Sequence, residues 1–196
     1  MSKNSWPGES PPSVGALRRA LETERRKIRT RYAMKSALAS VAILVALACA
    51  ISVFLLPVVQ IKGGTMAPAL KEGDIVLAPR IGGPKNGNLL AFYSGGRLLV
   101  KRVIAGPGEW IDIDSTGSVT VNGSYIDEPY AYKKIKGAGD IPLPAQVPDE
   151  RWFVLGDDRT ASIDSRYAAV GMIPGSDILG RPVFRIWPLD RFGPVS

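Results

Sequence analysis

The stretch SALASVAILVALACAISVFLLPVV, residues 36–59, contains 24 consecutive residues without a charge. At about 1.5 Å per residue, a helix of this length crosses a hydrocarbon layer of about 30 Å with some tilt. The 35 residues before it hold nine Lys or Arg and three Glu, a balance of +6 out of the net charge of +7. Because basic flanks stay in the cytoplasm, the pattern predicts a cytoplasmic tail and an extracytoplasmic C-terminal part.

A cleavable secretory signal is the main alternative to a retained anchor. Its basic region would be about 35 residues long, far longer than usual, and no small-x-small pair follows the apolar run before Gly63. We therefore divide the chain into a basic cytoplasmic tail (residues 1–35), a transmembrane signal-anchor helix (36–59) and an extracytoplasmic domain (60–196). Within the tail, residues 1–15 are expected to be disordered, and residues 14–31 are compatible with a helix that forms a solvated basic flank.

Composition limits the chemistry that the protein can perform. The chain has no histidine, which excludes Ser–His and Cys–His catalytic pairs and weakens any proposal of a zinc site. Its one cysteine, Cys49, lies inside the apolar run, so no intramolecular disulfide can form. The basic charge lies beside the apolar run, which argues against nucleic acid as a partner and favours membrane lipid. We expect no metal and no cofactor.

The region after Gln60 consists of short β-type runs separated by Gly, Pro and Asn. These patterns predict strands over residues 74–78, 89–93, 98–104, 110–113, 119–121, 151–155 and 179–186. Predicted hairpin turns occupy residues 94–97, 114–118 and 121–124, the last with a type I′ turn at Asn122-Gly123. Residues 133–150 are expected to form a long irregular insertion. The predicted fold class is an all-β domain with a single N-terminal transmembrane helix.

A hydrolase without histidine can still activate a hydroxyl group with a lysine. A free lysine has a pKa of about 10.4, and burial among apolar side chains lowers this pKa because the charged form is disfavoured. In the run LLVKRVI (residues 98–104), Lys101 and Arg102 point to opposite faces of a strand. We expect Lys101 to be buried and Arg102 to meet solvent; the alternative is a pair of surface cations. The hydroxyl candidate is Thr65, in a loop whose glycines let the backbone approach a substrate.

Three segments in this order resemble the bacterial type I signal peptidases, membrane-bound Ser–Lys proteases that remove signal peptides. That family shows an N-terminal anchor, a Gly-x-Ser-Met-x-Pro-Thr-Leu box, a lysine box, and a Gly-Asp-Asn-Arg box with Ser-x-Asp-Ser-Arg. The segments here are GGTMAPAL (residues 63–70), KRVIAGPGE (101–109) and GDDRTASIDSR (156–166). The resemblance runs from the anchor to Phe192, and it implies a signal-peptidase-like mixed β-sheet or barrel architecture.

The resemblance also implies a role for each matching residue. Thr65 takes the position of the nucleophile and Lys101 that of the general base, and Ser162 matches the hydroxyl that orients the lysine. Asp164 and Arg166 match an ion pair that supports the site.

The oxyanion of the reaction would be held by backbone N–H groups at Gly63, Gly64 and Thr65. Some family members have a hydroxyl two residues before the nucleophile; Gly63 stands there in this chain, so a second donor would have to come from the backbone. Met66, Pro68 and Leu70 are assigned to substrate binding. Met66 and residues 55–59 are expected to form part of a surface that touches the membrane.

The implied substrates are exported preproteins with small-x-small cleavage sites. In the family, small residues fit shallow pockets beside extended strands, which pair with the substrate by adding it as a further strand. The implied location is the bacterial cell membrane, in a single-pass protein whose N-terminus is cytoplasmic.

Three positions depart from the family pattern: Ala69 replaces Thr, Asp158 replaces Asn, and Thr65 replaces the nucleophilic Ser. Threonine keeps a hydroxyl group but adds a methyl group and restricts χ1. The favoured hypothesis is a working peptidase with a Thr65–Lys101 dyad, since threonine is a competent nucleophile in other hydrolases, where an amine acts as the base. The second is a noncatalytic relative that binds precursors, for example pilin-like ones, and assists their assembly. A third is that Thr65 was introduced to trap a substrate complex.

Overall fold

The computed structural model describes residues 14–80 and 82–195, so most of the segment expected to be disordered, residues 1–13, lies outside the described residues. The chain divides into two units, Met1–Ile51 and Ser52–Ser196, and each is described by itself.

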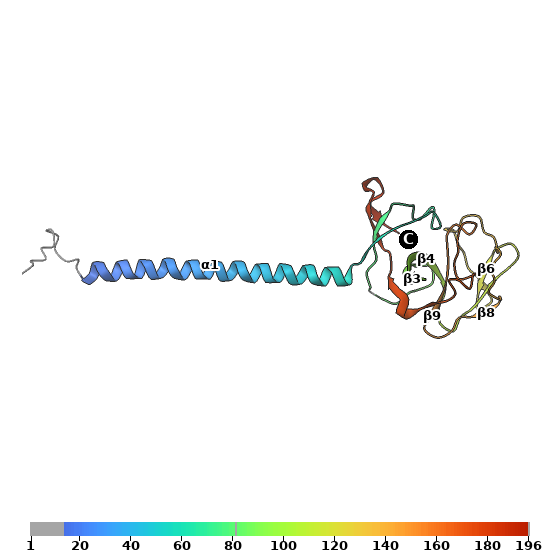
Figure 1. Cartoon of the computed structure of the whole chain (residues 1–196), viewed down its shortest axis with the longest axis horizontal. Coiled ribbons are helices and arrows are strands. Elements are labelled where there is room, and N and C mark those ends of the chain that lie inside the picture. The colour runs from blue at the N-terminus through green and yellow to red at the C-terminus, as the bar shows by residue number, and fades with distance from the viewer. Residues whose placement is uncertain (1–13, 81, 196) are drawn as a thin grey trace, which may run out of the picture. The chain divides into compact units, whose positions relative to one another are not determined.

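The described residues of the N-terminal unit all lie in one long helix, α1 (Val14–Leu55), which continues into the second unit and is shown in blue to cyan in Figure 1. It is the one helix among the described residues that is long and apolar enough to cross a membrane. The helix-compatible segment 14–31 and the apolar run therefore form a single continuous helix.

The predicted end of the membrane helix at residue 59 is wrong by four residues. The helix stops at Leu55, and residues 58–60 form strand β1. Pro57 explains the early end, because proline has no N–H to donate and disfavours helical geometry at the residue before it.

The C-terminal unit is built from three antiparallel sheets, which confirms the predicted all-β class. The first contains, in order, β1 (Val58–Gln60), β2 (Ile75–Leu77), β12 (Phe184–Trp187) and β13 (Gly193–Pro194). The second contains β10 (Ile173–Pro174), β9 (Arg151–Leu155), β4 (Arg97–Ala105), β3 (Leu89–Ser94) and β11 (Ile178–Gly180). The third contains β7 (Ser124–Tyr125), β6 (Val119–Val121), β5 (Trp110–Ile113) and β8 (Ala145–Gln146). Two 3₁₀ turns, η1 (Gly175–Asp177) and η2 (Leu189–Arg191), complete the unit.

The turn chemistry of the sequence is reproduced at the β6–β7 hairpin. Asn122 and Gly123 both have positive φ, 52° and 77°, as a type I′ turn requires. The strand expected over residues 179–186 is wrong: β11 ends at Gly180 and β12 begins at Phe184, in a different sheet. Pro182 lies in this interruption, where it cannot donate to a ladder. The expected irregular insertion also contains a short strand, β8.

Each face of the five-stranded sheet packs against its own apolar cluster. Leu89, Ala91 and Val100 lie in a cluster with residues from β1, β2 and the loop between them. Leu90, Phe92 and Val103 face the opposite cluster. A third cluster joins β5 and β6 to the end of β9. Strand β4 is therefore buried on both faces along its second half.

The first cluster corrects two expectations about the loop after β1. Met66 and residues 55–59 were expected at the membrane-touching surface, but Met66 and Val59 in β1 are only 2% and 1% exposed and belong to the core, whereas Leu56 and Val58 are exposed. Leu70 is fully buried in the same cluster, so its side chain is not accessible to a substrate. Their apolar character reflects packing beneath the loop, which fixes its backbone.

Gly180 provides a test of how closely β11 approaches the end of β2. A Cβ atom at this position would lie 2.1 Å from the carbonyl oxygen of Ala78. Gly180→Ala is expected to lower the free energy of unfolding by about 1–3 kcal/mol, as overpacking does. Gly83→Ala is the matched control, because its Cβ would meet nothing within 4 Å. Urea unfolding of the full chain in detergent measures both; equal stability of the two variants would contradict the close approach.

Candidate active site

Lys101 and Arg102 are both buried, although one of them was expected to meet solvent. They do point to different partners. Arg102 donates from Nε and Nη2 to the two carboxylate oxygens of Asp157, at 2.8 and 2.7 Å. Its Nη1 donates to the carbonyl of Gly87, and the ring of Tyr130 lies 4.0 Å from the guanidinium carbon. The buried charge of Arg102 is therefore neutralised by a bidentate ion pair.

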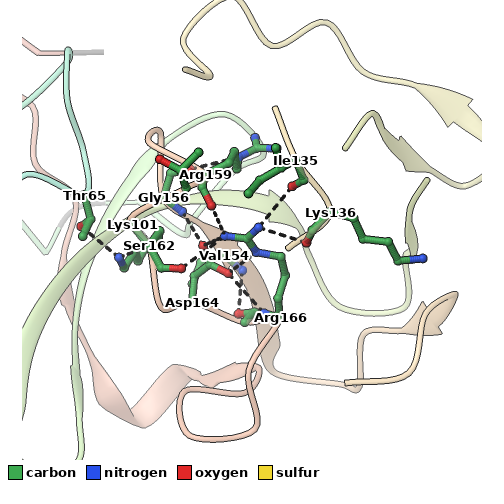
Figure 2. A network of polar contacts seen from close by, with 12 residues as sticks. Thr65, Lys101, Ile135, Lys136, Val154, Gly156, Arg159, Ser162, Asp164 and Arg166 are labelled. Carbon is green, nitrogen blue, oxygen red and sulfur yellow. Dashed lines mark hydrogen bonds and ion pairs between the residues drawn. The ribbon is translucent and has the colours of Figure 1, made fainter. Parts of the chain in front are cut away.

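The Lys101 amine lies between two hydroxyl groups that are distant in sequence. Its Nζ is 3.0 Å from Thr65 Oγ1 and 2.8 Å from Ser162 Oγ, and a charged Nζ donates to both. Figure 2 shows the three side chains together, with Asp164 and Arg166 close by. Three of the residues singled out in the sequence thus meet at one point.

Burial lowers the pKa of Lys101 from 10.5 to about 8. The side chain is 3% exposed, so water does not solvate its ammonium form. The negative charge of Asp164 acts in the opposite direction and raises the pKa, whereas the positive charge of Arg166 lowers it. The neutral form of the Lys101 amine is therefore a minor species at neutral pH, and it reaches half of the population at about pH 8.

The backbone around Thr65 is held by short-range hydrogen bonds and by the segment that follows β9. The Ala67 N–H donates to the Gly64 carbonyl at 3.0 Å, and the Asp158 N–H donates to the Thr65 carbonyl at 3.1 Å. Gly63 has φ of +78°, a conformation that glycine adopts without strain. Together with buried Met66, these contacts fix the position of the Thr65 hydroxyl.

A small cavity of about 30 Å³ adjoins the hydroxyl and the amine. Its walls are residues 59–62, Thr65 and Met66 on one side and residues 98–101 of β4 on the other. Along β4, pairing with β9 begins only at Arg102, whereas pairing with β3 covers residues 97–102. Residues 98–101 thus present a sheet edge to the cavity, and β1 faces it across the gap.

Ser162 is held by a compact turn after β9. The Gly156 N–H donates to Asp164 Oδ2 at 3.0 Å. A Cβ atom on residue 156 would lie 2.2 Å from Ser162 Oγ and 2.9 Å from the Thr65 carbonyl. Glycine at this position therefore lets the Ser162 hydroxyl and the Thr65 loop approach each other.

Arg166 is the centre of the contacts behind the amine (Figure 2). It pairs with Asp164 through Nε at 2.8 Å and Nη2 at 3.0 Å, and both side chains are buried. Nη2 also donates to the carbonyls of Arg159 and Ser162, at 3.0 and 3.3 Å. The predicted ion pair is therefore present, and it also closes the turn that carries Ser162.

The same arginine holds the insertion that the sequence left without a role. Its Nη1 donates to the carbonyls of Ile135 and Lys136, at 3.3 and 3.1 Å. The Ile141 N–H donates to the Arg166 carbonyl, and the Ala168 N–H donates to Asp140 Oδ1. Residues 135–141 are thus fastened to the turn that supports Lys101.

The structure brings Thr65, Lys101 and Ser162 together but separates the three residues assigned to substrate binding. Met66 lines the small cavity, Pro68 is exposed outside its lining, and Leu70 is in the core. Sequence reasoning missed the charged pairs beneath the site, Arg102–Asp157 and Arg159–Glu128. Their signal was weak, since buried charges look like surface charges in a single sequence.

No group of three or more Cys, Asp or Glu residues within the described part of the chain is arranged to hold a metal ion.

Comparisons with known proteins identify a family model and relatives that this chain resembles. The family model for signal peptidase, peptidase S26, matches residues 34–187. The signal peptidase IB of Staphylococcus aureus is 33% identical over 159 residues, covering 71% of this chain and 82% of that protein. The signal peptidase I of Leptolyngbya laminosa is 31% identical over 167 residues, covering 78% and 79%. A crystal structure of a signal peptidase I from Enterococcus faecalis V583 is 26% identical, covers 52% of this chain and 97% of that chain, and has a TM-score of 0.43.

A mostly-β domain follows an apolar helix that is long enough to cross a membrane, and the matching family and relatives are membrane-anchored peptidases. The chain belongs to the signal peptidase family, peptidase S26. At the level of the family, its members are hydrolases that remove signal peptides from exported preproteins.

The pKa of Lys101 can be measured directly. In the full chain with ¹³C-labelled lysine, the Lys101 resonance is expected to titrate near pH 8 because burial disfavours the ammonium form. The resonance is identified by its absence from Lys101→Met. A midpoint near 10.5, the ordinary value for lysine, would mean that burial does not lower the pKa and that the amine stays charged well above pH 8.

Proposed function

We propose that this protein removes signal peptides from exported preproteins with a Thr65–Lys101 dyad. The observation that supports the proposal is the position of the Lys101 amine, buried and within hydrogen-bond distance of the Thr65 and Ser162 hydroxyl groups. Burial also lowers the pKa of this amine to about 8, which suits a general base.

In the acylation step, the neutral Lys101 amine accepts the proton of the Thr65 hydroxyl. The Oγ1 atom attacks the scissile carbonyl carbon, and the carbonyl π electrons move to its oxygen. When the tetrahedral intermediate collapses, the C–N bond breaks and Lys101 returns its proton to the leaving amine. Ser162 keeps the amine oriented throughout, because it accepts a hydrogen bond from Nζ in either protonation state.

In the deacylation step, water replaces Thr65 as the nucleophile. Lys101 accepts a proton from the water, the hydroxide oxygen attacks the ester, and the proton passes to Thr65 Oγ1 as the ester bond breaks. The signal peptide leaves as a carboxylic acid, which loses its remaining proton to solvent, and the dyad is restored.

The oxyanion is assigned to the Thr65 backbone N–H. Among the described residues no hydrogen-bond acceptor is recorded for this group, so it is available to a substrate. Gly63 and Gly64 before it have no side chain to block the approach of a carbonyl oxygen. Because Gly63 carries no hydroxyl group, any second donor is a backbone N–H.

The specificity that we propose is for small side chains before the cleavage site. A cavity of about 30 Å³ accommodates a methyl group but not a large side chain. The open edge of residues 98–101 and the facing β1 strand can both hydrogen-bond an extended peptide, which fits recognition by strand addition.

The proposed location is the bacterial cell membrane, with residues 1–35 in the cytoplasm and the β domain outside. The basic residues before the apolar part of α1 support this orientation, because positively charged flanks are retained on the cytoplasmic side. Membrane lipid and exported preproteins are then the partners.

A noncatalytic precursor-binding protein is the competing function, and the threonine at the nucleophile position favours it. The methyl group of Thr65 restricts the rotamer of the hydroxyl group. The groups around Thr65 argue against a noncatalytic function. The Lys101 amine, the Ser162 hydroxyl that orients it and the Asp164–Arg166 pair are all present.

The proposal is tested by cleavage of a preprotein with an Ala-x-Ala site by the purified full chain in detergent. Thr65→Ala and Lys101→Met are each expected to lower the cleavage rate by more than about 10³-fold, since neither leaves a working dyad. Thr65→Ser is expected to raise the rate by up to about tenfold, because serine frees the rotamer of the hydroxyl group. Ser124→Ala, which removes an exposed hydroxyl on β7, is the matched control.

The pattern of results separates the two functions. An inactive parent chain that becomes active as Thr65→Ser would establish an intact scaffold with a disabled nucleophile, and the binding function would replace the enzymatic one. Parent activity that survives in Lys101→Met would exclude the proposed base.

The cleavage rate should also depend on pH. Below a pKa of about 8 Lys101 is charged and cannot accept a proton, so kcat/KM is expected to rise about tenfold per pH unit and to level off above that pKa. The profile is obtained from rates measured between about pH 6 and about pH 9, with a control that the buffers themselves do not change the rate. A rate that is flat across this range would show that Lys101 titration does not limit the reaction.

A further inference from the structure

A second and larger cavity, of about 250 Å³, lies between β3, β9, β11 and the segment that follows β2. Thr65 and Lys101 are not among the residues that line it. Its walls combine apolar groups, including Pro84, Leu90, Trp152 and Ile178, with the side chains of Arg80 and Arg181. The proposed peptidase reaction gives this cavity no role.

Arg80 is exposed and Arg181 is half-buried, and both are hydrogen-bonded to neutral groups of the chain. Arg80 Nε donates to the Leu179 carbonyl at 2.9 Å, and Arg181 Nη1 donates to Asn88 Oδ1 at 2.9 Å. Both acceptors are neutral. Within residues 14–80 and 82–195, neither guanidinium is in an ion pair with a carboxylate, whereas Arg102, Arg159 and Arg166 all are. Each guanidinium has five N–H donors, so most remain available to an anion.

The walls that carry the two arginines are fixed to each other. The Arg181 N–H donates to the Pro79 carbonyl at 3.1 Å, and Gly180 lies against the carbonyls of Ala78 and Pro79. Arg80 and Arg181 are therefore held on adjacent backbones before any ligand arrives. Such preorganisation lowers the entropy cost of binding an anion between them.

The chain path places this cavity close to the end of the membrane helix. The Ala78 N–H donates to the Pro57 carbonyl at 2.9 Å, and Pro57 follows the last residue of α1, Leu55, by two positions. Arg80 is two residues beyond Ala78, so at about 3.3 Å per residue its backbone is within about 10 Å of Pro57. If α1 crosses the bilayer, the residues just after it emerge among the phosphate groups of the lipids.

We propose that this cavity binds a phosphate group that carries an apolar body. The guanidiniums of Arg80 and Arg181 hold the phosphate oxygens, for which their planar donor pairs are well matched. Trp152 and the proline and aliphatic walls contact the attached group; tryptophan is common where an apolar wall meets a polar headgroup. An anionic phospholipid headgroup and free phosphate share this chemistry, and the hydrogen bond that joins Ala78 to Pro57, two residues after the last residue of α1, favours the lipid.

The test uses the full chain with ¹⁵N-labelled tryptophan in a nonionic, phosphate-free detergent. Dihexanoyl phosphatidylglycerol and inorganic phosphate are titrated separately, and the Trp152 indole N–H resonance reports occupancy of the cavity. We expect a saturable shift with phosphatidylglycerol, at least tenfold weaker in the double variant Arg80→Gln/Arg181→Gln. The control Lys71→Gln/Arg97→Gln, which removes two exposed charges from residues that do not line the cavity, should bind as the parent does.

The two ligands separate the sources of the phosphate. A Trp152 shift with phosphatidylglycerol but not with inorganic phosphate identifies the lipid, and a shift with inorganic phosphate identifies a site for the free ion as well. No saturable shift with either, or equal affinity in the double variant and the parent, overturns the proposal. Because the readout is binding at Trp152, its failure leaves the proposed peptidase activity untouched.

Discussion

The burial of one lysine is the constraint that the rest of the domain satisfies. Burial of an amine disfavours its charged form, and the buried position is tolerated only if hydrogen-bond partners replace the lost water. Lys101 finds these partners in two hydroxyl groups, 36 residues before it and 61 residues after it. The sheet therefore has to bring the loop after β1 and the turn after β9 to the same point on β4, and the hydrogen bond from Asp158 to Thr65 ties these two segments together.

Three buried ion pairs surround this point, and all involve the segment between β9 and β10. Arg102 with Asp157, Arg159 with Glu128 and Arg166 with Asp164 join that segment to β4, to the loop after β7 and to itself. Replacing such pairs with apolar groups is often neutral for stability, whereas removing one partner is costly. Their value here is geometric: charged groups with fixed partners specify where the Ser162 turn lies. The Arg166 guanidinium extends this to residues 135–141, so an insertion without regular structure still has a defined position.

The sequence predicted the fold class, most strands and the three residues that meet at the site, because period-2 patterns, turn residues and family motifs are local signals. It failed where tertiary packing decides. Met66 and Leu70 follow a glycine-rich loop, and whether such residues touch a substrate or a core depends on elements far away in the chain. Arg102 was placed in solvent because a single sequence does not reveal that Asp157 meets it across 55 residues. Gly156 was noted only as part of a motif; its role appears once the Ser162 hydroxyl is seen to occupy the space of its missing Cβ atom.

The unpaired start of β4 is useful only while it remains open, and an open strand edge is a hazard during synthesis and storage. Backbone groups that can accept a peptide can equally accept a strand of another molecule and begin aggregation. In this protein the open edge is restricted to four residues, 98–101, with the exposed cation Arg97 before them and the ladder to β9 after them. Short length and flanking charge are the devices by which sheets discourage edge-to-edge association. The short length of the open edge, which limits aggregation, also limits how many residues of a peptide it can bind by backbone hydrogen bonds alone.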